Sequence, residues 1–473
     1  RDRLMGKPAS VLLAPPAPVA KPEPRFFKPG WPLVVLYVFF PLWWALGLAQ
    51  LIFFVMAAAM VVILRKKGSL KVPHGFALWL LFMIWMFAGV LMVRAVAPDT
   101  APGFGLGRVF NFAVWAGWYV AVTVAMLYVA NTAKELPTQK VVRLLGWMFV
   151  VTAGFGVLAV LMPTLEFPSL MEVILPKSLV KTNFVRTLVH PSLASSSDFL
   201  GYVQPRPTAP FPYSNAWGNN IALYLPFFML ACFGKGAGWR RKLGPVVLVA
   251  ATFPIIFSLN RGLWISLAFA AIYASVRLAV NGRTRALQAL VGALLVGGIV
   301  FVSSPLYDTV VLRVETPHSN DRRAGTAETV ISVAAQGSPI LGFGTTRTMQ
   351  GSFSSLAGGE TAACHQCAAP PLGTQGFMWR LVLTTGFVGT ILCLGFFAVS
   401  FLRRARGPNP LDVACCTVLL DAVLCFFVYD SLGSAMFTAM IAIGLMARSD
   451  LPPEDRAPVD LAPENLVPKE VTA

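Results

Sequence analysis

Charged residues are scarce in this chain. Asp, Glu, Lys and Arg together make up only 12% of its 473 residues, whereas hydrophobic residues make up 56%. A soluble domain carries about 25% charged residues, so the deficit excludes an ordinary soluble protein. The composition instead predicts an all-α polytopic membrane protein, for which chain length does not indicate a number of soluble domains.

Acidic residues are fewer than basic residues in this chain. The chain has 21 acidic residues against 38 Lys and Arg, which gives a formal net charge of +17. An excess of this size can indicate a nucleic-acid-binding protein. The positive-inside bias of a many-helix membrane protein explains it better, so we expect no nucleic-acid partner.

Long apolar runs predict about twelve transmembrane helices, because a helix needs about 20 apolar residues to cross the hydrocarbon core. The run 31–64 is too long for one helix and contains Pro41 and Gly47, so two short helices are expected there. The other spans are predicted near 75–96, 109–130, 141–163, 216–234, 243–259, 262–280, 286–305, 377–402, 411–429 and 431–447. The transmembrane domain thus covers 31–447.

The two tails, 1–30 and 448–473, are rich in Pro and charge and are expected to be disordered. Residues 1–30 do not have the pattern of a cleavable signal peptide, because they are proline-rich and basic rather than apolar. One set of alternate loops, together with both tails, carries most of the lysines and arginines. The positive-inside rule therefore places both termini in the cytoplasm.

Two loops on the opposite, external side are long, at about 164–215 and 306–376. Long loops in a compact protein are usually functional or disordered. The stretches 165–180 and 326–335 within them have core-like apolar character and are expected to fold over the membrane surface. The chemistry is therefore expected in these two extracytoplasmic loops.

Two arginines mark the external face. Arg261 lies in a polar break, 258–262, between two charge-free apolar runs, and Arg206 precedes an amide-rich helix start that contains Asn215. The planar guanidinium suits phosphate oxygens and stays charged at physiological pH. Alternatives remain open: Arg261 can be a snorkelling lipid anchor, and Arg206 a surface residue beside a helix cap.

The second loop contains further cations and a glycine pair. Arg322 and Arg323 follow each other, and Gly342-Phe-Gly344 comes later. The glycine pair lacks the third glycine and the strand–turn–helix context of a nucleotide site, so a tight turn is expected.

Five of the seven cysteines lie in apolar runs and are expected to be packing residues: Cys232, Cys393, Cys415, Cys416 and Cys425. The other two form Cys364-His365-Gln366-Cys367. A structural zinc site needs four ligands, and this loop supplies no second pair. A disulfide between Cys364 and Cys367 is favoured, with free thiols and a metal site as alternatives. It would hold His365 on a constrained loop, as suits a base or a substrate contact.

Carboxylates in the external loops are Glu166, Glu172, Asp198, Asp308, Glu315, Asp321, Glu328 and Glu360. No spacing among them singles out a catalytic pair. Asp421 falls in the middle of an apolar run, where an ionisable side chain is either functional or hydrogen-bonded to a neighbouring helix. Asp430 lies near the outer end of the same run and can face the external site.

Taken in order, these motifs resemble the O-antigen ligase and O-antigen polymerase superfamily of bacterial envelope glycosyltransferases. The matching features are Arg206 before the helix start 215–220, Ser-x-x-Arg-Gly at 258–262, Pro-Ile-Leu-Gly-Phe-Gly at 339–344 and Gly-x-x-Gly at 386–389. The topology match covers most of 31–447.

The resemblance implies a metal-independent, inverting transferase without a cofactor, in the bacterial cytoplasmic membrane. The donor would be a glycan on a polyprenyl-(di)phosphate carrier, and the acceptor a glycan or glycolipid hydroxyl at the outer face. Arg206 and Arg261 are expected to hold the donor phosphates, with Arg322 or Arg323 assisting. Asn215, Gln375 and Trp379 are expected to contact substrate, and Tyr213, Trp217 and Trp379 can stack on sugars or anchor the membrane interface.

One position departs from the family pattern. Family ligases place a His-Asn pair shortly before the Gly-x-x-Gly, but this chain has Gln375-Gly376 there. Either His365 takes the role of the histidine as base, or this branch works without it. A transporter or flippase of lipid-linked glycans is the alternative function. It gives Asp421 a proton-coupling role but explains the two long loops poorly.

Overall fold

The computed structural model describes residues 29–102, 105–197, 204–285, 287–288, 291–292, 311, 318–350 and 371–448. Its first part contains α1 Trp31–Val38, α2 Phe40–Ala45, α3 Leu51–Arg65, α4 Phe76–Ala88, η1 Gly89–Met92, α5 Leu106–Asn131, α6 Thr138–Leu161, α7 Leu170–Ile174, α8 Lys177–Val180 and α9 Asn183–Val189. The rest contains β1 Ala194–Ser197, β2 Gln204–Pro207, α10 Ser214–Phe233, α11 Arg240–Phe257, α12 Arg261–Val280, α15 His318–Gly337, α16 Phe377–Arg404, α17 Pro410–Phe426 and α18 Ser434–Arg448.

The architecture is all-α, and the antiparallel β1–β2 hairpin is the only sheet in the part of the chain that the structure describes. Five of these helices, α5, α6, α10, α12 and α16, are long and apolar enough to cross a membrane. The prediction of an all-α membrane protein is therefore confirmed. The predicted tails and most of the predicted span 286–305 lie outside the described residues.

The first apolar run differs from the prediction of two short helices. It forms three pieces, because the chain leaves the helix at Phe39 and again between α2 and α3. Pro41 lies in the first turn of α2, where its missing N–H costs no hydrogen bond. Gly47 lies in the second gap with a φ of 75°, a conformation that glycine adopts without strain.

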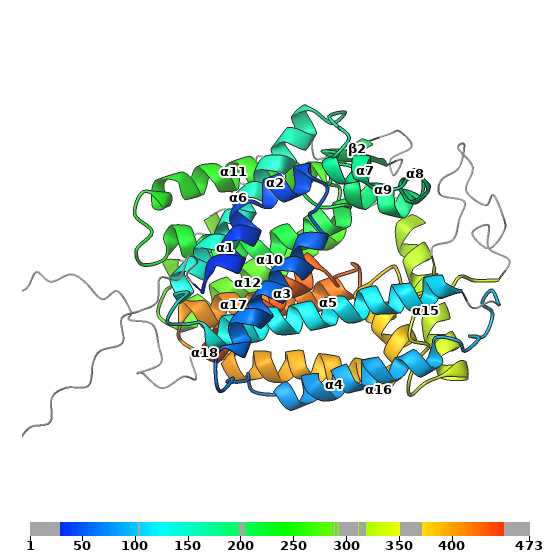
Figure 1. The fold of residues 1–473 in the computed structure, drawn as a ribbon. Coiled ribbons are helices and arrows are strands. Elements are labelled where there is room, and N and C mark those ends of the chain that lie inside the picture. The colour runs from blue at the N-terminus through cyan, green and yellow to red at the C-terminus, as the bar shows by residue number, and fades with distance from the viewer. Residues whose placement is uncertain are drawn as a thin grey trace, which may run out of the picture.

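The core of the bundle is built around α10, which packs against α6, α11, α17 and α18 (Figure 1). Trp217 is fully buried, and a Cβ added to Gly156 of α6 would lie 2.7 Å from its ring. In contrast, Ile265, Phe269 and Ile272 of α12 are more than half exposed. An apolar helix face of this kind suits contact with lipid.

Several of the segments that link these helices lie at one end of the bundle. Figure 1 shows α7, α8, α9, β2 and α15 there, and we refer to it as the loop end. Within α15, Val330 and Val333 are buried, which confirms the core-like character of 326–335. In the other stretch, 165–180, Val173 and Ile174 are 74% and 65% exposed.

Helix α16 is broken at Gly386, whose φ is 66°. The segment 339–344 crosses it there, and the Phe387 N–H donates a hydrogen bond to the Pro339 carbonyl at 2.8 Å. A Cβ added to Gly342 would lie 2.5 Å from the Gly386 nitrogen, so both glycines are needed for the crossing. Two motifs that are far apart in the sequence thus meet in space.

Candidate functional site

Arg206 joins the β hairpin to the tip between α11 and α12. It lies on β2 opposite Ser195 of β1, and only 7% of its surface is exposed. Its Nε donates a hydrogen bond to the Ser258 carbonyl at 2.6 Å. Arg206 therefore contacts the polar break 258–262 directly.

Arg261 is the first residue of α12, at the tip itself. Helix α11 ends before it because Leu259 adopts a left-handed conformation with a φ of 51°. Asn260 then caps α12, its side-chain oxygen accepting from the Leu263 N–H at 3.4 Å. An asparagine N-cap satisfies a backbone donor that the helix itself leaves open. The Ser-x-x-Arg-Gly motif thus forms a helix stop followed by a helix start, with Arg261 at the start.

Tyr429 packs against this tip from the segment that follows α17. The buried Tyr429 hydroxyl donates to the Asn260 side-chain oxygen. A Cβ added to Gly262 would lie 2.6 Å from the Tyr429 oxygen, so only glycine allows this approach. Arg206 also lies within electrostatic reach of Tyr429.

Arg323 of α15 approaches the same residues. Burial lowers the pKa of the Arg323 guanidinium, Tyr429 opposes this, and the positive charge of Arg261 lowers the pKa further. Arg206 and Arg323 therefore lie within electrostatic reach of Tyr429, and Arg261 lies within electrostatic reach of Arg323. We refer to these three arginines as the arginine cluster. Like charges held together in this way favour the binding of an anion, which lowers their repulsion.

An ion pair lies beside the arginine cluster. Arg380 of α16 is buried, pairs with Asp430 and stacks on Trp115 of α5 at 4.3 Å from the ring centroid. Asp430 is 40% exposed at its side chain. Partial burial, and then the Asp430 carboxylate, raise the pKa of the Tyr213 phenol. Asp430 thus lies within electrostatic reach of Tyr213, the residue before α10.

Buried amides line the space between α10 and α12. Asn219 donates from its Nδ2 to the Ser431 hydroxyl at 2.9 Å. Among the described residues, the other amide atom of Asn219, Oδ1, has no hydrogen-bond partner, and neither does Nδ2 of Asn260. Asn215, predicted as a substrate contact, lies in the first turn of α10 and is half-buried.

Gln375 and Trp379 lie beside the segment that follows α17 and carries Tyr429 and Asp430. The Phe377 N–H donates to the Tyr429 carbonyl at 2.8 Å, and the Trp379 indole donates to the Phe427 carbonyl at 3.0 Å. Gln375, two residues before Phe377, is half-buried. The start of α16 is therefore fixed against the residues that carry Tyr429 and Asp430.

Several predicted residues are not brought to this site. Trp217 is fully buried and donates to the Thr152 carbonyl at 3.0 Å, so it is a core residue and cannot stack on a sugar. Asp421 accepts from the Ser266 hydroxyl at 2.9 Å and links α17 to α12, which favours its structural interpretation. The side chain of Arg322 and all of Cys364, His365 and Cys367 lie outside the described residues.

The sequence alone did not identify three residues of this region: Tyr429, Arg380 and His190. Arg380 carried a usable signal, because a buried cation in the first turn of an apolar helix needs a counter-charge. His190 and Tyr429 gave no such signal, since their partners lie far away in the sequence.

No group of His, Cys, Asp and Glu among the described residues has the arrangement of a metal site. The chain matches no known family model, and no curated protein matches its sequence.

Proposed function

We propose that this protein is a membrane glycosyltransferase that moves a glycan from a polyprenyl-(di)phosphate carrier to a glycan or glycolipid hydroxyl. The observation that carries the proposal is the arginine cluster at the loop end of an apolar bundle. Its cations come from the segments whose order resembles the O-antigen ligase and polymerase superfamily. The lipid-facing surface of α12, which begins at Arg261, offers a path for the carrier.

The proposed reaction needs stabilisation of a leaving phosphate. The acceptor oxygen attacks the anomeric carbon, the bond from that carbon to the phosphate oxygen breaks, and the phosphate leaves with the electron pair. The acceptor proton passes to a base. A preorganised charge contact to the leaving group is typically worth about 3 kcal/mol, or roughly a hundredfold in rate.

The proposal includes an orientation. About twelve spans place both termini in the cytoplasm and the loop end outside the bacterial cytoplasmic membrane, where lipid-linked glycans are displayed. Lys66 follows α3, Arg241 lies in the first turn of α11 and Arg403 lies in the last turn of α16. These are ends of helices that the positive-inside rule places on the cytoplasmic side. No cofactor is required for the transfer.

Purified protein in detergent, given a labelled polyprenyl-diphosphate-linked oligosaccharide and lipid-anchored acceptors, tests the proposal. Wild-type protein should form a new glycosidic linkage.

Arg261→Ala should lower the rate about a hundredfold. Arg261→Lys should also be impaired, because an ammonium cannot make two parallel contacts to one phosphate. Arg241→Ala, an exposed arginine at the first turn of α11, is the matched control and should keep the wild-type rate. An Arg261→Ala protein that transfers at the wild-type rate would contradict the proposal.

A transporter of lipid-linked glycans is the second candidate. This candidate rests on Asp421, whose Oδ1 accepts from Ser266 but whose second carboxylate oxygen, Oδ2, has no hydrogen-bond partner among the described residues and lies deep in the bundle. The same purified protein, reconstituted in vesicles, separates the two functions. Movement of labelled lipid between leaflets without a new linkage would indicate a transporter.

A further inference from the structure

Short helices at the loop end carry large apolar side chains that the bundle does not cover. These helices are α7, α8 and α9, which lie beside β2 in Figure 1, and α9 packs against both α7 and α8. The exposed fractions are 74% for Val173, 65% for Ile174, 48% for Leu179 and 65% for Phe184. We refer to these side chains as the apolar patch. Large apolar side chains gathered at a protein surface mark an interaction surface.

The residues just before the apolar patch are fixed to the gap between α2 and α3. The Met171 N–H donates to the Leu46 carbonyl at 3.2 Å. The Ser169 hydroxyl donates to the Val189 carbonyl at 2.5 Å, and a Cβ added to Gly47 would lie 2.3 Å from that hydroxyl. The glycine that breaks the first apolar run therefore lets the segment 164–193 close over it.

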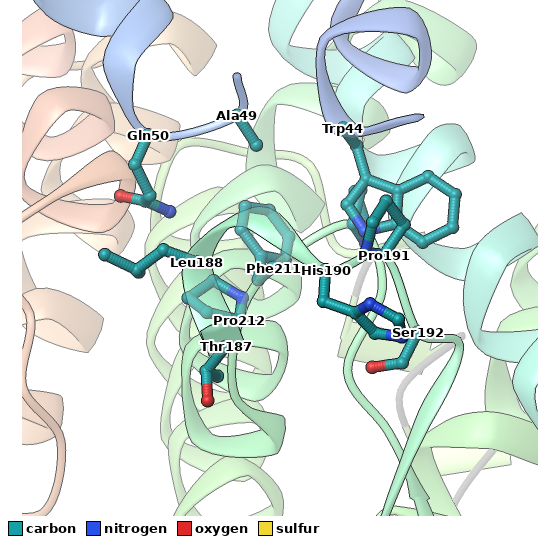
Figure 2. Close-up of a pocket in the computed structure, with 11 residues that line it drawn as sticks. Trp44, Ala49, Gln50, Thr187, Leu188, His190, Pro191, Ser192, Phe211 and Pro212 are labelled. Carbon is teal, nitrogen blue, oxygen red and sulfur yellow. The ribbon is translucent and has the colours of Figure 1, made fainter. Parts of the chain in front are cut away.

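The residues just after the apolar patch are fixed to the same gap. Leu188 and His190 line a narrow space together with Trp44 and Gln50 (Figure 2). His190 Nδ1 also lies 2.7 Å from Glu172 Oε2, which ties the end of the segment back to α7. The stretch between these contacts is therefore held at both ends while its own apolar side chains stay uncovered.

The charge of this stretch is positive alone. Residues 173–187 contain Lys177, Lys181 and Arg186, which are all exposed, and no acidic residue. We refer to these as the basic residues of the segment. Cations beside exposed apolar side chains are typical of a helix in the membrane interface, where the cations meet anionic headgroups. A protein partner is disfavoured, because protein interfaces are depleted in lysine.

The position of the segment along the chain also suits a membrane surface. Helix α6, which is long and apolar enough to span a membrane, ends at Leu161, and α10, which is too, begins at Ser214. Leu161 and Met162 are 67% and 50% exposed, so uncovered apolar side chains lead from the span into the segment. An interfacial helix buries its apolar face about 5–10 Å into the boundary between headgroups and acyl chains, a depth that a segment directly after a span can reach.

We propose that α7, α8 and α9 form an interfacial anchor that binds anionic phospholipid at the loop end. The apolar patch enters the acyl region, and the basic residues of the segment contact lipid phosphates. The inference depends on the membrane location of the bundle and not on the proposed transfer reaction. Because β1 follows α9 and pairs with β2, the anchor also holds the hairpin that carries Arg206.

The depth of the apolar patch is measured on full-length protein in lipid nanodiscs that each hold one copy. A nitrobenzoxadiazole label is attached to Phe184→Cys in a protein that also carries Cys364→Ser and Cys367→Ser, since the other five cysteines are buried. The nanodiscs contain equal parts of phosphatidylcholine and phosphatidylglycerol, with a nitroxide on some acyl chains. The nitroxide should quench this label about twofold more than a label on Glu328→Cys, an exposed control position of α15 at the same end.

The choice of headgroup is tested with charge variants of the same labelled protein. Replacing all the basic residues of the segment with Gln, or using phosphatidylcholine alone, should lower the quenching of the Phe184→Cys label by on the order of twofold. Added salt should act in the same direction. A variant with Lys66→Gln, Arg241→Gln and Arg403→Gln, which removes three exposed cations elsewhere, should leave the quenching unchanged. An unchanged thermal unfolding temperature establishes that each variant is folded.

Three results would overturn the proposal. The first is a label on Phe184→Cys that lipid quenches no more than the label on Glu328→Cys. The second is equal quenching in the two lipid mixtures and in the charge variant, which would exclude anionic phospholipid as the occupant. The third is a label that leaves water only when two copies share a nanodisc, which would make the apolar patch an interface between copies. None of these results changes the outcome of the transfer assay, so the two proposals fail separately.

Discussion

Arg347 and Arg261 are both arginines of the segments that connect the helices, but their surroundings differ. Arg347 is 1% exposed and donates from its two terminal nitrogens to six backbone carbonyls, those of Met92, Val93, Ala95, Phe343, Thr345 and Thr346, at 3.0 to 3.3 Å. Arg261 is only partly buried and lies among other cations. Burial of an arginine alone therefore does not indicate a phosphate site.

The difference lies in what surrounds each charge. Neutral carbonyl dipoles bind the two terminal nitrogens of Arg347, and burial, with the nearby charge of Arg108, lowers its pKa to about 10. Such a guanidinium is a structural clamp that ties the segment after α15 to the residues after η1. In the arginine cluster, Arg261 and Arg323 repel each other, and an anion is the group that lowers this repulsion. Variants at the two places should therefore fail in different ways.

The largest effect is expected for Arg347→Met. The substitution leaves up to six buried carbonyls without their donor, at about 1–3 kcal/mol for each group that water cannot reach. We expect the protein to lose more than about 3 kcal/mol of stability, or to fail to accumulate, as measured by thermal unfolding in detergent. Arg261→Ala should unfold within a few degrees of wild type. If Arg347→Met is as stable as wild type, Arg347 is not a structural clamp, and its role does not differ from that of the arginine cluster in the way stated.

An intermediate effect is expected for Gly262→Ala. The added Cβ would lie 2.6 Å from the oxygen and 3.0 Å from the Cζ of the buried Tyr429 ring. Overpacking of this kind costs about 1–3 kcal/mol. Because the ring has to move away from Asn260, transfer should fall along with the unfolding temperature.

Gly154→Ala on α6 is the matched control for that variant. A Cβ at Gly154 would meet nothing within 4 Å, and alanine stabilises a helix interior by about 0.5–1 kcal/mol relative to glycine. It should therefore unfold at the wild-type temperature or slightly above it. If Gly262→Ala and Gly154→Ala unfold at the same temperature, the contact between Gly262 and Tyr429 does not hold the tip between α11 and α12 in place.

The sequence was sufficient for the features that depend on local pattern. Apolar runs located α5, α6, α10 and α12 to within a few residues, because a span is a continuous stretch of one composition. The break at 258–262 was recognisable for the same reason. The order of motifs also indicated that Arg206 and Arg261 belong together.

Features that depend on contacts between distant segments could not be predicted. Arg347 and Arg323 look alike in the sequence, and only the carbonyls of 92–95 make one of them a clamp. His190 and Glu172 are 18 residues apart, a spacing that no helix or strand brings together. The closure of 164–193 onto Gly47 pairs them. Trp217 was misassigned because its position beside the amide-rich helix start does not indicate which face of α10 is buried.

The smallest effect is expected for Asp430→Asn, which tests whether the ion pair beside the arginine cluster belongs to it. The Arg380 side chain is only 5% exposed, but Asp430 is 40% exposed, so water screens the pair from the Asp430 side. A screened ion pair contributes up to about 1 kcal/mol to stability. The asparagine keeps an oxygen that can accept from Arg380, and Arg380 keeps its contact with Trp115. Stability should therefore change by less than about 1 kcal/mol.

Loss of one negative charge near the cluster should raise donor affinity about twofold at low salt, an effect that salt screens. Equilibrium binding of the labelled donor at two salt concentrations measures this. A large loss of transfer would instead place Asp430 among the groups that act on the substrate.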